Sequence, residues 1–312
     1  MTNQPFLQEV ENDSGLNNLK STQDWLKENK IFIELKLEEH GAIIFKDLPV
    51  KTAEDFDQFV STFNYDTFTY EESLSNAVRI NKTDKVFTAN EAPREVEIFL
   101  HHEMAQTPTY PKNIFFFCKS ASETGGETPL CRSDQLYEAL LKADKALVES
   151  FEKFGVIYNS IMSSGDELIS GQGRSWQKTL GVSSKNDAEA KLSKLGYSWN
   201  WIEDDNLSVT TKTLQATKEL GNGQKSFFNQ VIAASLGWKK NSENQIAPVR
   251  FGNGEEIKES YIELISELAQ SLTLLRSWQD RDILLIDNYR VMHGRKPFSG
   301  NKNREVLVSL TN

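Results

Sequence analysis

The sequence predicts a mainly β protein, in which a β-sandwich or barrel core carries helical insertions. Short apolar runs recur along the 312 residues, whereas only a few segments show a helical period. The two kinds of segment do not alternate regularly, which disfavours a parallel sheet built from βαβ units. A chain of this length can bury a substantial core, and we expect one domain over residues 1–312.

Three segments carry the helical pattern. Residues 52–63 begin with a capping pair, Thr52 and Asp55, after which phenylalanines recur on one helical face. A longer helix is predicted over residues 133–155, which end in glycine, and a third over residues 255–275. These helices are the expected insertions.

The predicted strands are short runs of apolar and β-branched residues bounded by polar or turn residues. Their positions are spread over the whole chain, so the core must be assembled from distant segments. The runs lie at residues 41–46, 113–118, 155–158, 283–287 and 305–310.

Two parts of the chain are less regular. The first 13 residues are polar and lack a clear period, so we expect a loose N-terminal arm. Residues 160–226 mix polar connections with small amphipathic pieces. Such an insertion is either a lid or wall for a substrate or a surface excursion without a role, and the sequence leaves both open.

Charge and cysteine content exclude several classes of partner. The chain has 35 Lys and Arg against 45 Asp and Glu, a net charge of −10 that would repel nucleic acid and anionic membranes. Its two cysteines, Cys118 and Cys131, are too few for a disulfide framework. No apolar run approaches the roughly 20 residues of a membrane helix. We therefore expect a soluble cytoplasmic protein that binds neither nucleic acid nor a membrane.

Three of the four histidines lie in two short strings beside apolar runs. The first string is His101-His102-Glu103, and the second contains His293. Because side chains alternate along a strand, His101 and Glu103 would point to one side and His102 to the other. With His293 as the further donor, the set predicts a 2-His-1-carboxylate site that leaves three iron positions open for a chelating cosubstrate and oxygen.

Two nearby features could hold a cosubstrate with a carboxylate. Paired glycines at residues 125–126 allow close backbone approach and are followed by the hydroxyl of Thr128. Arg304 lies just before the last predicted strand, where a fixed guanidinium could bind a dicarboxylate through two hydrogen bonds.

The strings "HHEMAQTPTYPKNIFFFCKSASETGGETPLCRS" and "WQDRDILLIDNYRVMHGRKPFSGNKNREVLVSL" together resemble the taurine dioxygenase (TauD/TfdA) family of iron(II)- and 2-oxoglutarate-dependent oxygenases. The resemblance is closest to the branch with the syringomycin-pathway aspartyl hydroxylase type and the clavaminate-synthase-like enzymes. It extends from about residue 40 to residue 310. It implies a distorted double-stranded β-helix, or jelly roll, with helices packed outside.

The resemblance also implies roles for the residues singled out above. His101, Glu103 and His293 would ligate iron, and Arg304 would pair with the distal carboxylate of 2-oxoglutarate beside the hydroxyl of Thr128. The implied reaction decarboxylates 2-oxoglutarate to succinate with O2 and produces a ferryl species that oxidises an unactivated carbon. Hydroxylation is the usual outcome, while desaturation or oxidative ring closure by the same species stays open.

The substrate implied by this branch is an amino acid or an amino-acid-derived molecule of specialised metabolism, free or tethered to a carrier protein. Four residues are candidates for binding it: Arg79, Asn90, Asn229 and Asn288. We expect Arg79 to pair with a substrate carboxylate. Two other classes compete with the oxygenase, namely a zinc hydrolase, for which the HExxH helix is absent, and a non-catalytic binding protein on the same scaffold.

The chain departs from the family pattern at two positions. Arg281 stands where the family often has glycine before the aspartate of a turn, which we interpret as a local variation. Val308 stands where taurine dioxygenase has a second arginine for a sulfonate, so a sulfonate substrate is disfavoured. In addition, Glu103 fills the position that an iron halogenase must leave vacant for chloride, which disfavours halogenation.

Overall fold

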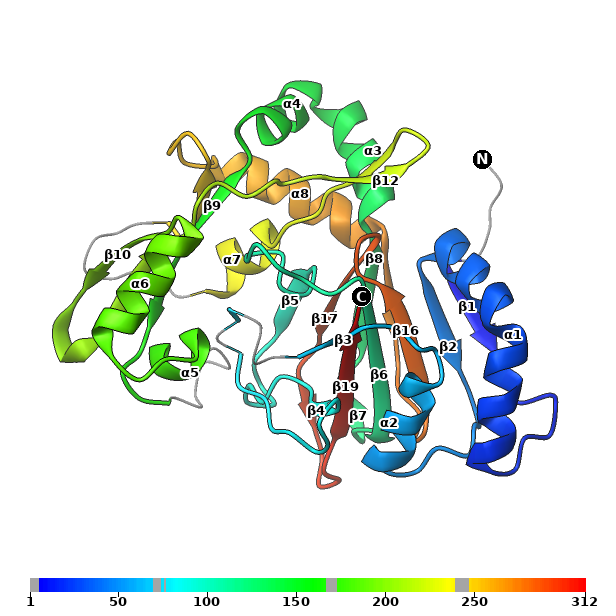
Figure 1. Cartoon of the computed structure of the whole chain (residues 1–312). Coiled ribbons are helices and arrows are strands. Elements are labelled where there is room, and N and C mark those ends of the chain that lie inside the picture. Colours follow the sequence, from blue (N-terminus) through cyan, green and yellow to red (C-terminus); the bar gives the residue numbers. More distant parts are fainter. Residues whose placement is uncertain (1–5, 70–73, 76, 167–172, 239–246) are drawn as a thin grey trace.

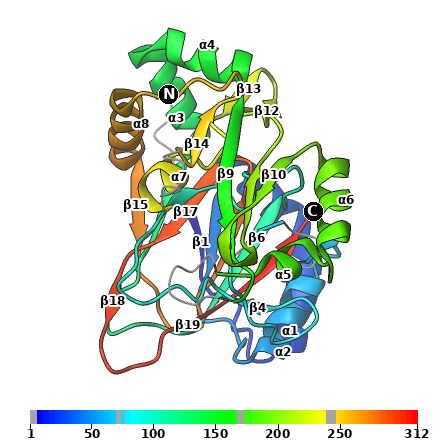
Figure 2. The same ribbon diagram turned by 90° about the vertical axis from the view of Figure 1, so that its left-hand side faces the viewer.

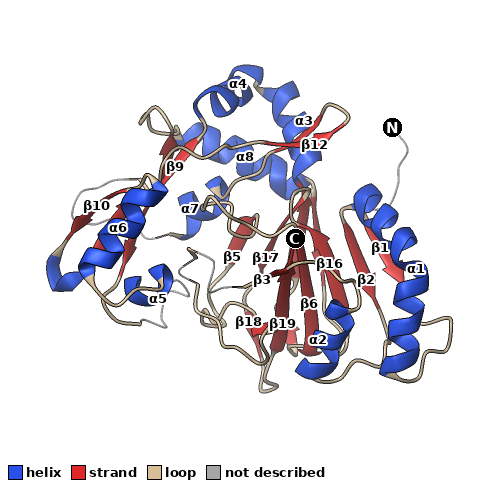
Figure 3. Cartoon of the chain, in the orientation of Figure 1, coloured by secondary structure: helices blue, strands red, loops and turns tan. Residues whose placement is uncertain are grey.

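Two β-sheets face each other at the centre of the molecule, and helices pack outside them (Figures 1 and 3). This arrangement confirms the predicted jelly-roll core with helical insertions. The computed structural model describes residues 6–69, 74–75, 77–166, 173–238 and 247–312.

The larger sheet contains most of the predicted strands. Within the described residues it has seven strands, in the order β1-β2-β16-β6-β19-β3, with β4 also paired to β19. The strands are β1 (Leu7–Val10), β2 (Ala42–Phe45), β16 (Ile283–Asp287), β6 (Asn113–Ser120), β19 (Glu305–Thr311), β3 (Thr67–Phe68) and β4 (Phe87–Thr88).

The smaller sheet faces it and has the order β15-β8-β17-β5. Its strands are β15 (Thr273–Arg276), β8 (Thr128–Arg132), β17 (Val291–Arg295) and β5 (Ile98–His101). A third sheet extends the core and contains β10 (Ser198–Trp201), β11 (Leu207–Thr210), β9 (Val156–Met162) and β14 (Val249–Phe251). One two-stranded ribbon pairs β12 (Lys218–Gly221) with β13 (Gln224–Ser226). Another pairs β7 (Thr124–Gly125) with β18 (Phe298–Ser299).

The helices cover the outer faces of these sheets. Within the described residues they are α1 (Leu19–His40), α2 (Ala53–Ser61), α3 (Ser133–Ala143), α4 (Lys145–Phe154), α5 (Trp176–Leu180), α6 (Lys185–Leu195), α7 (Val231–Gly237) and α8 (Glu259–Ser271), with a 3-10 turn at Glu203–Asp205.

The central strands are apolar on both faces because both faces are covered. In β6, Phe115 and Phe117 pack in the cluster that α1 and α2 cover, whereas Ile114 and Phe116 pack in the cluster between the sheets. Burial on both sides explains why these strands read as unbroken apolar runs rather than as an alternating pattern. The space between the sheets is where the chemically interesting residues meet.

Two predicted helices end differently in the structure. The segment 133–155 is two helices, because Asp144 interrupts it and accepts a hydrogen bond from the Leu147 amide (2.9 Å), so that α4 begins anew. The segment 255–275 contains a helix only at Glu259–Ser271. The following Thr273–Arg276 is strand β15, which pairs with β8.

Helix α1 is absent from the sequence prediction. Its apolar residues do not form one clean stripe, since Ile31, Phe32 and Leu35 are 74%, 52% and 60% exposed. Asn18 caps the helix by accepting from the Ser21 amide at 2.9 Å. Apolar side chains on the exposed face thus hid the helical period.

The less regular segments also acquire structure. Residues 7–10, inside the predicted N-terminal arm, form β1 in parallel with β2. Residues 160–226 contain α5, α6 and the strands around them, and Figure 1 places α6 and β10 on the opposite side of the molecule from α1; Figure 2 shows β9 and β10 from that side. Among the described helices, none is both long and apolar enough to span a bilayer.

Candidate metal centre

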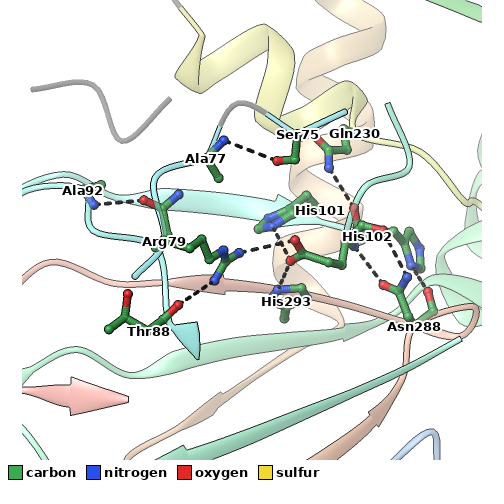
Figure 4. Close-up of polar contacts among 12 residues, drawn as sticks. Ser75, Ala77, Arg79, Thr88, Ala92, His101, His102, Gln230, Asn288 and His293 are labelled. Atoms are coloured by element: carbon green, nitrogen blue, oxygen red, sulfur yellow. Dashed lines mark hydrogen bonds and ion pairs between the residues drawn. The ribbon is translucent and has the colours of Figure 1, made fainter. Parts of the chain in front are cut away.

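His101 and His293 face each other across two antiparallel strands of the smaller sheet. His101 ends β5 and is the register partner of His293 in β17, and their ring centroids are 4.5 Å apart (Figure 4). Gly294 allows this approach, because a Cβ there would lie 2.4 Å from the Ile98 carbonyl oxygen. The sheet register therefore fixes the histidine pair.

Glu103 joins the pair from a turn and not, as predicted, from the same strand. Strand β5 ends at His101, and Met104 takes a positive φ of 60°. The Glu103 Oε2 atom nevertheless lies 3.9 Å from His101 Nε2 and 3.5 Å from His293 Nε2. One donor atom from each of the three residues lies within 4.8 Å of the others, the spacing of a metal site.

The protonation states suit a cation. The His101 Nδ1 atom lies 2.8 Å from the Phe99 carbonyl oxygen and must donate to it, so Nε2 carries the lone pair. Burial, with a smaller effect of His293, lowers the pKa of His101 to about 4. Burial alone would raise the pKa of Glu103, but Arg79 and the two imidazoles outweigh it and hold that pKa well below its ordinary value. The site therefore offers a neutral imidazole at His101 and a carboxylate at Glu103 at neutral pH.

Asn288, predicted to bind substrate, instead holds the backbone of Glu103. Its Oδ1 accepts from the Glu103 amide (2.8 Å), and its Nδ2 donates to the carbonyls of Glu103 (3.1 Å) and Pro111 (2.8 Å). Its own carbonyl bonds to Nδ1 of His102, which lies on the far side of the turn (Figure 4). The amide group is fully used, so a role in binding substrate finds no support.

Asn229, another substrate candidate, is also a backbone brace. Its side chain donates to the Ala216 carbonyl and accepts from the Val231 amide, both at 2.9 Å, and the residue is 1% exposed. It lines neither of the two cavities next to the histidines. Asn229 and Asn288 were both predicted from the sequence to bind substrate. In the structure, both side chains instead form hydrogen bonds with the backbone of the protein.

Arg79, predicted to pair with a substrate carboxylate, pairs with Glu103. The Arg79 Nη2 atom donates to Glu103 Oε1 at 3.3 Å, and both side chains are buried. Asn90, the fourth candidate, accepts from the Ala92 amide through Oδ1 and lines both cavities. Of the four candidates, Arg79 and Asn90 therefore reach the site.

One cavity connects the histidines with the predicted cosubstrate residues. His101, His293, Thr128 and Arg304 all line it. The Thr128 hydroxyl accepts from the Trp278 indole at 2.9 Å, which leaves its own proton to donate into the cavity. The structure thus brings the two histidines and the hydroxyl–guanidinium pair to one cavity.

The orientation of Arg304 depends on its neighbours. Its Nη2 donates to the Gly126 carbonyl at 3.2 Å, and its guanidinium lies 5.3 Å from the Phe298 ring centroid. Gly126 has a φ of 74°, and a Cβ there would lie 3.0 Å from Arg304 Nε. Gly126 thus gives Arg304 its space, while burial lowers the pKa of Arg304.

Sequence reasoning missed Arg295, a second buried guanidinium that lines the cavity. It donates to the carbonyls of Ala92 (3.0 Å), Pro93 (2.7 Å) and Val96 (2.9 Å), and it also lies 5.3 Å from the Phe298 ring. The sequence could have indicated this residue, because Arg295 lies two positions after His293. Alternation on a strand points the two side chains to the same face.

A second cavity is lined by Glu103 and shares Ile98 and His101 with the first. Besides Arg79 and Asn90, its lining includes the side chains of Glu103, Gln106 and Trp238. Gln106 Oε1 is buried without a hydrogen-bond partner among the described residues. A polar lining next to the candidate metal ligands is suited to a small polar ligand.

A jelly-roll core with two histidines and a carboxylate between its sheets defines the class of mononuclear non-haem iron oxygenases. The chain belongs to the TauD/TfdA family of iron(II)- and 2-oxoglutarate-dependent oxygenases, because the family model "Taurine catabolism dioxygenase TauD, TfdA family" matches residues 7–310. The protein is therefore an enzyme that uses iron(II), 2-oxoglutarate and O2, as the sequence resemblance implied.

Individual relatives agree with this assignment. A clavaminate synthase-like protein of Arabidopsis thaliana is 33% identical over 91% of this chain and 86% of its own. The dapdiamide synthesis protein DdaC of Enterobacter agglomerans is 27% identical over 88% of this chain and 83% of its own. The fold matches PvcB, an Fe, alpha-ketoglutarate dependent oxygenase of Pseudomonas aeruginosa, with a TM-score of 0.53 and 13% identity over 99% and 88% of the two chains.

Family membership decides between the classes that the sequence left open. A zinc hydrolase and a non-catalytic binding protein are both set aside. The residues fit the family's metal on the structure's own terms, since the three donors converge, His101 is neutral and Glu103 is ionised.

Proposed function

We propose that this oxygenase hydroxylates an unactivated C–H bond of an amino acid or an amino-acid-derived molecule in specialised metabolism. The observation that carries the proposal is the convergence of His101, Glu103 and His293 beside a cavity that also holds Thr128 and Arg304. A relative named for dapdiamide synthesis supports a biosynthetic role. The same chemistry diverted to desaturation or ring closure is the alternative.

Each residue has a distinct task in the proposed site. His101, Glu103 and His293 hold iron(II), which together with 2-oxoglutarate and O2 supplies the oxidant for the C–H bond. Arg304 binds the distal carboxylate of 2-oxoglutarate with the Thr128 hydroxyl beside it. A buried guanidinium is suited to this task because it stays charged and presents several donors in one plane.

The second cavity is the proposed substrate side. Asn90 and Gln106 can present their amide groups there, which suits a carboxylate- or amide-bearing molecule. The insertion at 160–226 supports this wall, since Arg174 donates to the carbonyl of Ser75, a lining residue, at 3.4 Å. We propose that the insertion is part of the same single domain and bounds the substrate.

The substrate is free or tethered to a carrier protein, and the cavity chemistry is compatible with both. Two buried free cysteines fit a reducing compartment, so we propose the cytoplasm.

Anaerobic titration tests the cosubstrate site. Iron(II) with 2-oxoglutarate should give a visible charge-transfer band with wild-type protein, and His293→Ala should abolish the band. An unchanged band in that variant would refute the assigned ligands. Arg304→Ala should weaken the apparent binding of 2-oxoglutarate, and unchanged binding would refute its assignment.

Succinate release then tests the substrate class. A panel of free amino acids and carrier-tethered aminoacyl groups is compared with a panel of amines and hydrocarbons that lack a carboxylate or amide. Stimulation confined to the second panel would contradict the proposal. Product mass then distinguishes hydroxylation, a gain of one oxygen, from desaturation, a loss of two hydrogens.

A further inference from the structure

The two oxygens of the Glu103 carboxylate have different neighbours. Oε2 faces the histidines, at 3.9 Å from His101 Nε2 and 3.5 Å from His293 Nε2. Oε1 accepts a hydrogen bond from Arg79 Nη2 at 3.3 Å. The Arg79 and Glu103 side chains are 8% and 4% exposed, so this is a buried ion pair in which water does not screen the charges.

The segment that carries Arg79 is braced from within. The Arg79 Nη1 atom donates to the Thr88 carbonyl at 3.5 Å (Figure 4). Thr88 is tied back to Ile80 by two hydrogen bonds, one through its amide (2.9 Å) and one through its hydroxyl (3.0 Å). The guanidinium is therefore held in place from its own side of the site, as Glu103 is held by Asn288 from the other.

We propose that Arg79 is a positioning residue that restricts Glu103 to one metal-binding oxygen. The proposal rests on the proposed function, in which Glu103 is a metal ligand. A carboxylate beside a cation can bind through one oxygen or through both. By occupying Oε1, the guanidinium leaves Oε2 as the atom presented to the ion.

The number of oxygens decides how many positions the protein leaves open. Two histidines and one carboxylate oxygen leave about three of six positions for the cosubstrate and O2, whereas a second carboxylate oxygen would leave about two. A chelating cosubstrate would then fill the site completely. Arg79 does not raise the affinity for a metal ion, because its positive charge repels a cation. Its role is to keep one coordination position of the ion vacant.

Mn(II) with water proton relaxation tests this inference without turnover, since relaxation counts the exchangeable waters on the bound ion. Wild-type protein with Mn(II) alone should show about three waters, and Arg79→Met about two, a fall in relaxivity of about one third. Mn(II) affinity should be unchanged or higher in Arg79→Met. Arg79→Lys keeps a cationic donor and should restore three waters, which also serves if the methionine variant does not fold.

Arg304→Met is the matched control, since it removes another buried arginine of the same cavity whose hydrogen bond goes to Gly126. It should keep about three waters with Mn(II) alone. If Arg79→Met keeps the wild-type water count, or loses Mn(II) affinity tenfold or more as a generally loosened site would, the positioning role is wrong. If wild-type protein does not bind Mn(II), the proposed function itself fails, which is a distinguishable result.

Discussion

His101 and His293 are register partners on the antiparallel strands β5 and β17, with ring centroids 4.5 Å apart. Their imidazoles therefore converge through the hydrogen-bonded register of a sheet and not through a flexible loop. A one-residue slip of either strand would send one ring to the opposite face. The geometry of this pair is thus as stable as the smaller sheet itself.

Metal binding should stabilise the fold, because the proposed ligands come from segments far apart in the sequence. Mn(II) at about 100 times its dissociation constant should add about 2.7 kcal/mol to the free energy of unfolding. The measurement is thermal unfolding with and without Mn(II). His293→Ala should lose this increment, and an equal gain in that variant would place the ion elsewhere.

Asn288→Ala should destabilise the protein and also loosen the metal site. The substitution removes the two hydrogen bonds that Asn288 makes to the buried amide and carbonyl of Glu103, at a cost of about 1–3 kcal/mol each. Urea unfolding measures stability, and Mn(II) titration measures affinity. Asn229→Ala is the control, since it removes a similar buried brace without touching Glu103. Equal Mn(II) affinity in both variants would show that Asn288 does not position Glu103.

Phe298 should contribute to 2-oxoglutarate binding although it does not line the cavity. Its ring lies 5.3 Å from the guanidinium carbons of both Arg295 and Arg304, and each such contact is worth about 0.5–2 kcal/mol. Phe298→Leu should therefore weaken binding of N-oxalylglycine, a non-reactive analogue, by about threefold to tenfold. Phe298→Tyr keeps the ring and should bind as wild type. Equal weakening in both variants would rule out the ring as the cause.

Arg281→Gly should be more stable than Arg281→Ala. Arg281 has a φ of 79°, a left-handed conformation that costs a residue with a Cβ about 1–2 kcal/mol. A glycine at this position would avoid that cost. Both variants lose the distant contact to Asp47 (3.9 Å), so they differ mainly in the Cβ. Urea unfolding should separate them by about 1 kcal/mol, and the opposite order would contradict the assigned backbone.

The two thiols should be inert in the folded protein and should make stability fall at high pH. Burial raises the pKa of Cys118 and of Cys131 from 9.0 to about 12. The unfolded chain loses these protons first, so the contribution is complete below pH 9 and is lost as the pH rises toward 12, by up to about 1.4 kcal/mol per unit for each thiol. Thiol titration at pH 8 should detect reaction only after unfolding. Rapid reaction of the folded protein would contradict their burial.

The sequence predicted the elements whose burial pattern is simple. Helix α2 was predictable because Thr52 and Asp55 form a complete capping box. The central strands were predictable because both faces are covered, which produces unbroken apolar runs. Helix α1 was not, since Ile31, Phe32 and Leu35 are exposed and blur the period, and the break at Asp144 depends on a local cap within a continuous helical pattern.

By itself, the sequence determined the jelly-roll class, the family and the residue types of the site, because two histidines, a carboxylate and an arginine in this order carry a recognisable chemistry. Only the tertiary structure decided how they are arranged. It placed Glu103 in a turn, assigned Asn288 to its backbone and paired Arg79 with its second oxygen. The physical reason is that local spacing specifies which way a side chain points, whereas a buried polar group takes its partner from whatever distant segment the fold brings within hydrogen-bond distance.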